Sequence, residues 1–144
     1  MMIASYLAQG RARLEQLLSD LEPMIEDAEL ERAEYVATDL ASELCRRICF
    51  EQALLPIFAQ RTLLVRAATV MQHEHVELEH RLAALLTTFQ GGHVDSVRAS
   101  FAVLAGLIRE HTRRANTVLA PLLDEVLGPI EGGQLVARMN EKRS

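Results

Sequence analysis

Two histidines in this sequence interrupt series of apolar residues, and an imidazole in such a place can do chemistry. The residues of each series are three or four apart, which is typical of the buried face of a helix. The two series are Met71, His75, Leu78, Leu82 and Leu85, and Leu104, Ile108, His111, Ala115, Val118 and Leu122. A buried histidine is either a metal ligand or a structural residue whose ring nitrogens need hydrogen-bond partners.

Charged residues interrupt two further apolar series in the same way. Arg47 and Glu51 are four residues apart, and Arg11 comes shortly before another series. The apolar residues around them are Leu44, Ile48 and Leu55, and Leu14, Leu17 and Leu18. Fe(II) and Zn(II) bind imidazole nitrogen and carboxylate oxygen together, so Glu51 is a suitable third ligand beside the two histidines.

The four polar residues that interrupt the apolar series are separated by repeated intervals. Arg11 and Arg47 lie 36 residues apart, and the same interval separates the two histidines. His75 follows Arg11 by 64 residues, and His111 follows Arg47 by 64 residues. The segments that follow them are similar: "RARLEQLL" (11–18) matches "HVELEHRL" (75–82), and "RICFEQALLP" (47–56) matches "HTRRANTVLAP" (111–121), with one residue fewer before the proline. The spacing indicates two similar helical hairpins.

Four helices are needed to position these residues, and strand signals are absent from the sequence. The helical periodicity predicts helices over about 3–28, 30–60, 62–89 and 95–121, the last extending slightly beyond. Thr62 is the expected N-cap of the third helix, and Asp95 or Ser96 that of the fourth. Pro23 is expected to kink or split the first helix, and Pro56 to kink the second or end it early. The third helix should stop at Gly91-Gly92.

Short connections between long helices favour an all-α, up-down-up-down four-helix bundle over residues 1–127. Residues 128–144 form a C-terminal tail with a short helix around Leu135. Gly128-Pro129 and Gly132-Gly133 are the expected breaks in this tail.

The charge and the hydropathy exclude two classes of partner. The sequence has 144 residues and a formal net charge of −5, whereas nucleic-acid binding needs clustered Lys and Arg. No apolar run is long enough to span a bilayer, and the N-terminus lacks the features of a signal peptide. We expect a cytoplasmic protein that binds neither nucleic acid nor membrane.

Cys45 and Cys49 are four residues apart on the second expected helix, where a disulfide is poorly placed. Unpaired thiols fit a reducing compartment such as the cytoplasm. They could form a redox or metal-binding pair, because the neighbouring Arg46 and Arg47 favour the reactive thiolate. We favour the commoner role of small buried hydrophobic residues.

His73, Glu77 and His80 share a different face of the third helix, at spacings of four and three. They could bind a divalent ion, but a solvated face is the favoured interpretation.

The chain resembles the bacterial hemerythrin-like family, also called the HHE cation-binding domain, over about residues 7–127. The resemblance lies in "QGRARLEQLLSDLE", "LCRRICFEQALLP", "MQHEHVELEHRLAALL" and "LIREHTRRANTVLAPLLDEVL". It implies a four-helix bundle with a non-haem di-iron centre. The first and third helices of the family each supply a His, and the second and fourth each supply a His-x-x-x-Glu pair.

Carried over by position, the resemblance is partial. His75, His111 and Glu51 keep family ligands, whereas Arg11, Arg47 and Ala115 stand where family ligands would be. The amides Gln52 and Asn116 come next to the two acid positions. Both histidines of one iron are replaced by arginine and both histidines of the other remain, so an intact di-iron centre is not expected.

Two states of the remaining site are open. His75, His111 and Glu51 could hold one iron, or alternatively zinc, as a two-His-one-carboxylate site. Otherwise Glu51 pairs with Arg47 and Arg11 in a buried ion network, and the histidines are neutral core residues. The positions in the second helix also have an alternative, because counting back from Pro56 would place Arg46 and Phe50 in the ligand positions.

Two functions follow from these two states. The first is a degenerate hemerythrin-like metal-binding protein, with a role in oxygen, nitric oxide or iron sensing or in a stress response. The second is a metal-free four-helix bundle that acts as an interaction or regulatory module, as a homodimer or with another protein partner. No nucleophile, acid–base pair or phosphate-binding motif is recognisable, so the sequence favours a non-enzymatic role.

Overall fold

The computed structural model describes residues 2–143, and every regular element within this range is a helix. The elements are α1 (Met2–Glu26), α2 (Leu30–Ala59), the 3₁₀ turn η1 (Thr62–Leu64), α3 (Val65–Gly91), α4 (Val94–Arg114), the π-helical segment η2 (Ala115–Leu119) and α5 (Ala120–Arg143). The prediction of an all-α protein with four long helices is confirmed. No helix of the described range is long and apolar enough to cross a membrane.

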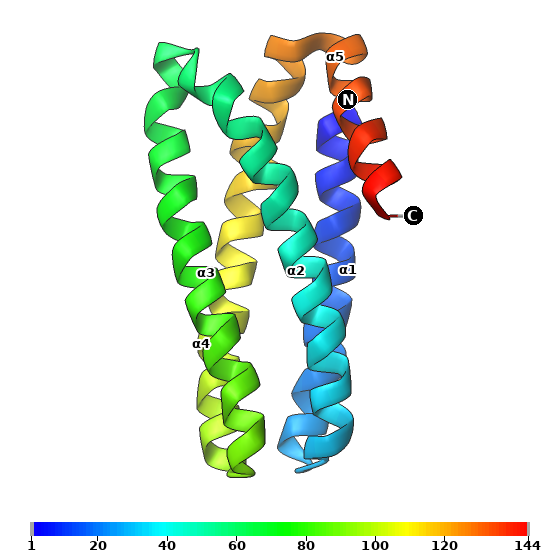
Figure 1. Cartoon of the computed structure of the whole chain (residues 1–144), viewed down its shortest axis with the longest axis vertical. Coiled ribbons are helices and arrows are strands. Elements are labelled where there is room, and N and C mark those ends of the chain that lie inside the picture. The colour runs from blue at the N-terminus through cyan, green and yellow to red at the C-terminus, as the bar shows by residue number, and fades with distance from the viewer. Residues whose placement is uncertain (1, 144) are drawn as a thin grey trace.

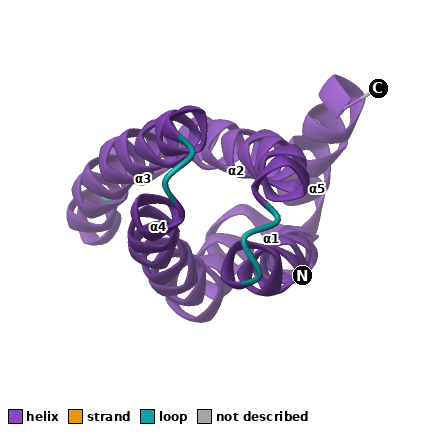
Figure 2. Cartoon of the chain, turned by 90° about the horizontal axis from the view of Figure 1, so that it is seen from below, coloured by secondary structure: helices purple, strands orange, loops and turns teal. Residues whose placement is uncertain are grey.

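The helices α1 to α4 run along the long axis of the molecule and lie side by side (Figure 1). Each packs against its neighbours in the chain, and α1 also packs against α4. Viewed from below, the four helices surround a common centre (Figure 2). Apolar side chains from all four helices are buried between them. The loops after α1 and α3 lie at the same end of the molecule (Figure 1).

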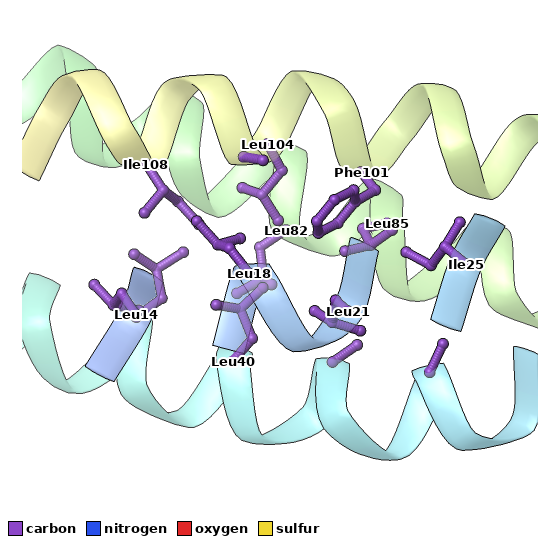
Figure 3. Close-up of a cluster of buried hydrophobic side chains, with 14 of the residues drawn as sticks. Leu14, Leu18, Leu21, Ile25, Leu40, Leu82, Leu85, Phe101, Leu104 and Ile108 are labelled. Atoms are coloured by element: carbon purple, nitrogen blue, oxygen red, sulfur yellow. The ribbon is translucent and has the colours of Figure 1, made fainter. Parts of the chain in front are cut away.

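Two apolar clusters fill the interior. Leucines, isoleucines and phenylalanines from all four long helices interdigitate in the larger cluster, as Figure 3 shows. The smaller cluster lies at the other end, where residues of α1, α2, α3 and α5 meet; among them are Ile3, Leu7, Phe50, Phe58, Met71, Leu123 and Met139. The buried polar residues lie on α2, α3 and α4, at the boundary between these two clusters; they are Arg47, Glu51, His75, His111 and Thr112.

The apolar face predicted for the fourth helix is correct only as far as Ala115. Val118 and Leu122 are 53% and 41% exposed, and Ala120 and Leu123 are buried in their place. The reason is the π-helical segment Ala115–Leu119, because a π turn holds one residue more than an α turn and rotates all that follows. It accounts for the extra residue in the matched segment 111–121.

The predicted helix ends are partly wrong. Thr62 lies inside the turn η1, and α4 begins at Val94, before Asp95 and Ser96, so none of the three is an N-cap. Pro56 lies inside α2 and does not end it early, and the end of α2 at Ala59 agrees with the predicted end at about residue 60. The stop after α3 is confirmed, since Gly92 has the left-handed φ of 71° that glycine adopts without strain.

The last helix is longer than predicted. Gly128 has φ 73° and ψ 173°, so the predicted break at Gly128-Pro129 is present. The predicted break at Gly132-Gly133 is wrong, because helix continues through both residues to Arg143. Val136 and Met139 on this helix are buried in the smaller cluster with Ile3. The division of the chain at residue 127 stays a prediction.

Candidate metal centre

The three residues predicted as metal ligands meet in the interior. Glu51 of α2, His75 of α3 and His111 of α4 are each at most 3% exposed. The Nε2 atoms of His75 and His111 lie 2.8 and 2.6 Å from the same carboxylate oxygen, Oε1 of Glu51. One donor atom from each residue lies within 4.8 Å of the other two. It is the only such cluster of possible ligands among residues 2–143.

Arg47 binds the other carboxylate oxygen of Glu51, Oε2. Its Nε donates to Oε2 of Glu51 at 2.8 Å, one terminal nitrogen donates to the carbonyl of Leu7 at 3.0 Å, and the other donates to Oδ1 of Asn116 at 2.8 Å. Each of the three guanidinium nitrogens therefore has an acceptor, and the side chain is buried. A buried charge is tolerated only when it is satisfied in this way.

The alternative assignment of the second helix is wrong. Arg46, which counting back from Pro56 would place inside, lies near the surface and pairs with Glu43. Phe50 packs in the smaller apolar cluster. The inward residues are Arg47 and Glu51, as the match between the two hairpins predicts.

The pairing of Glu51 with Arg11, which the metal-free alternative includes, is absent from the described contacts. Arg11 is half-buried and makes no hydrogen bond or ion pair with Glu51 among the described contacts. Gly10 faces the site instead, and a Cβ atom added to it would lie 3.6 Å from a terminal nitrogen of Arg47. A glycine within a helix costs roughly 1 kcal/mol relative to alanine, and this Cβ atom would be in ordinary van der Waals contact with the guanidinium, so an alanine would also fit here.

Glu74 and Arg114 extend the site towards the surface, and the sequence patterns missed both. Oε1 of Glu74 lies 3.2 Å from Nδ1 of His111, and the same carboxylate pairs with Arg114. Arg114 Nε lies 3.6 Å from Oε1 of Glu110. Positive and negative groups alternate from the interior outwards: Arg47, Glu51, His111, Glu74, Arg114 and Glu110. The available signal was that Glu74 directly precedes His75 and that Arg114 follows His111 by three residues, on two facing helices.

These contacts change the ionisation of two residues. Burial by itself would raise the pKa of Glu51, but hydrogen bonds from His111 and His75 and the nearby positive charges hold it far below its usual range. Burial would lower the pKa of His111, but its hydrogen bonds to Glu51 and Glu74 and their charges raise it to about 9. The raised pKa favours an imidazolium at neutral pH, whereas the metal-free alternative expects two neutral core histidines.

His75 is less completely satisfied than His111. Its Nε2 faces the ionised Glu51, so this nitrogen carries the proton and donates it. Its Nδ1 is buried and has no hydrogen-bond partner among the described residues. An orphaned buried nitrogen is uncommon in a structural network, and it marks a place where a ligand or a water is needed.

The π-helical segment determines which residue stands in place of the acid that the resemblance places after His111. Ala115, four residues after His111, is buried and offers no polar atom. Asn116 supplies the side chain that enters the site, where it accepts the hydrogen bond from Arg47. Asn116 precedes Pro121 by five residues, as Glu51 precedes Pro56, so counting back from the proline would have found it.

The other candidate residues lie outside the site. Cys45 and Cys49 are both exposed, so their favoured interpretation as buried hydrophobic residues is wrong. His73 and His80 are exposed as well, and Glu77 pairs with Arg81, which agrees with the solvated face.

Two imidazoles and one carboxylate from three helices form a donor set that suits one Fe(II) or Zn(II) ion. The unpartnered Nδ1 of His75 lies on the other side of the ring from Nε2, so it does not bear on this donor set. A di-iron centre does not fit, because the permanently charged Arg47 and the neutral amide of Asn116 occupy the other side. Comparison of the chain with protein-family models, with curated proteins and with solved structures finds no match.

Proposed function

We propose that this chain is a hemerythrin-like, up-down-up-down bundle that binds a single divalent metal ion, iron in the first place and zinc as the alternative. The observation that carries the proposal is the convergence of Glu51, His75 and His111 within 4.8 Å in the interior. In this proposal Arg47 replaces the second metal as the fixed positive charge beside Glu51.

Two neighbouring residues, Arg47 and Glu74, orient the ligand atoms for one ion. Arg47 holds Oε2 of Glu51, which leaves Oε1 directed at both histidines. Glu74 holds Nδ1 of His111, so its Nε2 is kept directed at Glu51, as second-shell carboxylates do in metal sites. The ion would supply a Lewis-acid or redox centre with open coordination positions, which suits sensing of oxygen, nitric oxide or iron in a reduced, cytoplasmic setting.

Metal content tests the proposal. Protein purified without a His tag or chelator, and loaded with iron anaerobically, should contain about one ion per chain, and chelation should lower its melting temperature. His75→Ala should lose the ion. His73→Ala is the matched control, because it removes an exposed histidine from the same helix. Absence of metal together with melting unaffected by chelator would refute the proposal.

A metal-free interaction module is the second candidate. It is favoured by exposed apolar residues one turn apart after the site, namely Val118, Leu122 and Val126, all at least 38% exposed, with the exposed Ile130 beyond the break at Gly128. On this alternative the charge network is purely structural, and these apolar residues bind a second copy of the chain. Sedimentation should then show a dimer that Leu122→Glu dissociates, with no dependence on metal. A monomer at all concentrations would contradict it.

A further inference from the structure

A small cavity lies beside the candidate metal centre, between the start of α3 and the π-helical segment. Its volume is about 260 Å³. Side chains that line it include Arg66, Met71, Glu74, Arg114, Val118 and Leu119. The walls are mainly apolar, and two arginines are among the lining residues.

The cavity depends on the extra residue of the π-helical segment. Without the π turn, the apolar pattern of the fourth helix would bury Val118 in the core. With it, Val118 is 53% exposed and forms part of the cavity wall together with Leu119. Single π turns are often found at functional sites, and this one shapes both the cavity and the contact of Asn116 with Arg47.

The cavity is positively charged although the whole chain carries a net charge of −5. Arg66 makes no hydrogen bond or ion pair with any described residue. Nε of Arg114 is buried without a hydrogen-bond partner among the described residues and lies 3.6 Å from Oε1 of Glu110, and a terminal nitrogen of Arg114 pairs with Glu74. Glu74 in turn is shared with His111. The unpaired donors at the mouth of the cavity are therefore those of the exposed Arg66, and Arg114 adds a positive charge beside them.

We propose that this cavity binds a small monocarboxylic acid, with the carboxylate at Arg66 and Arg114 and a short aliphatic chain against Val118, Leu119 and Met71. Arginine binds carboxylates through paired N–H donors, which a neutral ligand cannot use fully. The volume is at the lower end for ligand pockets, which limits the ligand to a short chain. Free phosphate or sulfate suits the arginines but not the apolar wall.

This inference goes beyond the proposed metal-binding function and does not depend on it. Among the described residues, Glu74 is the one cavity residue that makes a hydrogen bond or ion pair with Glu51, His75 or His111. Binding can therefore be measured on the full chain with and without metal, and failure of one proposal leaves the other standing.

Isothermal titration and amide chemical-shift mapping with hexanoate test the proposal. Hexanoate should bind and should shift amides around residues 66–71 and 114–119. Hexanol, which has the same chain without the charge, and inorganic phosphate, which has charge without the chain, should each bind at least about tenfold more weakly, which corresponds to about 1.4 kcal/mol. Equal binding of hexanol and hexanoate, or no binding of hexanoate, would overturn the proposal.

Three variants place the binding at this cavity. Arg66→Gln should weaken hexanoate binding by about tenfold without affecting the fold, since Arg66 has no other described partner. Val118→Phe should fill the cavity and abolish binding. Arg113→Gln is the matched control, because Arg113 is exposed, pairs with Glu110 and does not line the cavity. If Arg66→Gln and Val118→Phe both leave hexanoate binding unchanged, as the control does, this location is refuted.

Discussion

The two hairpins of this chain place different chemistry at equivalent positions. The first hairpin carries Arg11 and Arg47, whereas the second carries His75 and His111 at the same spacing. A guanidinium keeps its proton and its charge at every physiological pH, whereas an imidazole can give up its proton and bind a metal. The first half of the site therefore supplies a fixed charge, and the second half supplies groups whose state can change.

The two halves also depend on each other. Arg47 of the first hairpin donates to Asn116 of the second, and His111 of the second hairpin contacts Glu51 of the first. Glu51 is the one carboxylate that all three of Arg47, His75 and His111 contact. The comparison predicts that the network fails as a whole when this carboxylate is removed, and only locally when a peripheral residue is changed.

The largest effect is expected from Glu51→Ala. The substitution leaves Arg47 and the charged His111 buried without their common partner, and removing one member of a buried ion pair typically costs about 3–5 kcal/mol. Urea unfolding should show a loss of this size in the free energy of unfolding. Glu43→Ala, which removes a half-buried glutamate from the same helix, should cost much less. Equal losses would contradict the central place of Glu51.

The two arginines of the first hairpin should differ in their contribution. Arg47→Met removes a buried guanidinium that donates to three acceptors, one each on Glu51, Leu7 and Asn116, and leaves these acceptors without that donor. We expect the free energy of unfolding to fall by roughly 3 kcal/mol. Arg11→Met should change the free energy of unfolding by less than about 0.5 kcal/mol, since Arg11 is outside the network. Similar losses in both variants would show that Arg11 takes part in the network in solution.

The pH dependence of stability should come from the second hairpin. The pKa of His111 is about 9 in the folded chain, against an ordinary value of about 6.5 in the unfolded chain. The stabilisation is therefore fully present below pH 6.5 and is lost as the pH rises through 9. The linked change is at most about 3 kcal/mol, and His111→Gln should remove it. A wild-type stability that is flat between pH 6.5 and 9 in metal-free protein would contradict the charged state of His111.

The smallest effect is expected at the amides next to the two acid positions. Asn116→Ala leaves one terminal nitrogen of Arg47 without an acceptor, which should cost about 1 kcal/mol in the free energy of unfolding. Gln52→Ala, the matched change in the first hairpin, affects an exposed side chain and should be close to neutral. Thermal unfolding of the two variants compares them directly, and a larger loss in Gln52→Ala would reverse the assignment.

Where the helices are regular, the hydrophobic periodicity of the sequence was sufficient to predict which side chains point into the core. The inward directions of His75, Arg47 and Glu51 follow from their spacing within uninterrupted α-helix, because each residue turns the side chain by a fixed angle. The same rule failed at Val118 and Leu122, since the π-helical segment between them and His111 adds a residue to one turn. The one-residue difference between the matched segments was the only sign of it.

Contacts between helices could not be predicted in this way. The exposure of Cys45 and Cys49 depends on which faces of α2 the neighbouring helices cover, and periodicity within one helix does not determine it. How close Gly10 lies to Arg47, and whether Glu74 pairs with Arg114, depends on the rotation of facing helices. The convergence of the candidate ligands Glu51, His75 and His111 was predictable because a core position limits where a side chain can point.

The measurement that tests the central claim most directly is an anaerobic titration of the metal-free protein with Co(II), followed by visible absorption and by proton release. Glu51, His75 and His111 should bind one Co(II) per chain, with release of protons that now lie between the imidazoles and the carboxylate. The same titration of His75→Ala should give no absorption. Two ions per chain, or no binding to the wild-type chain, would contradict the account.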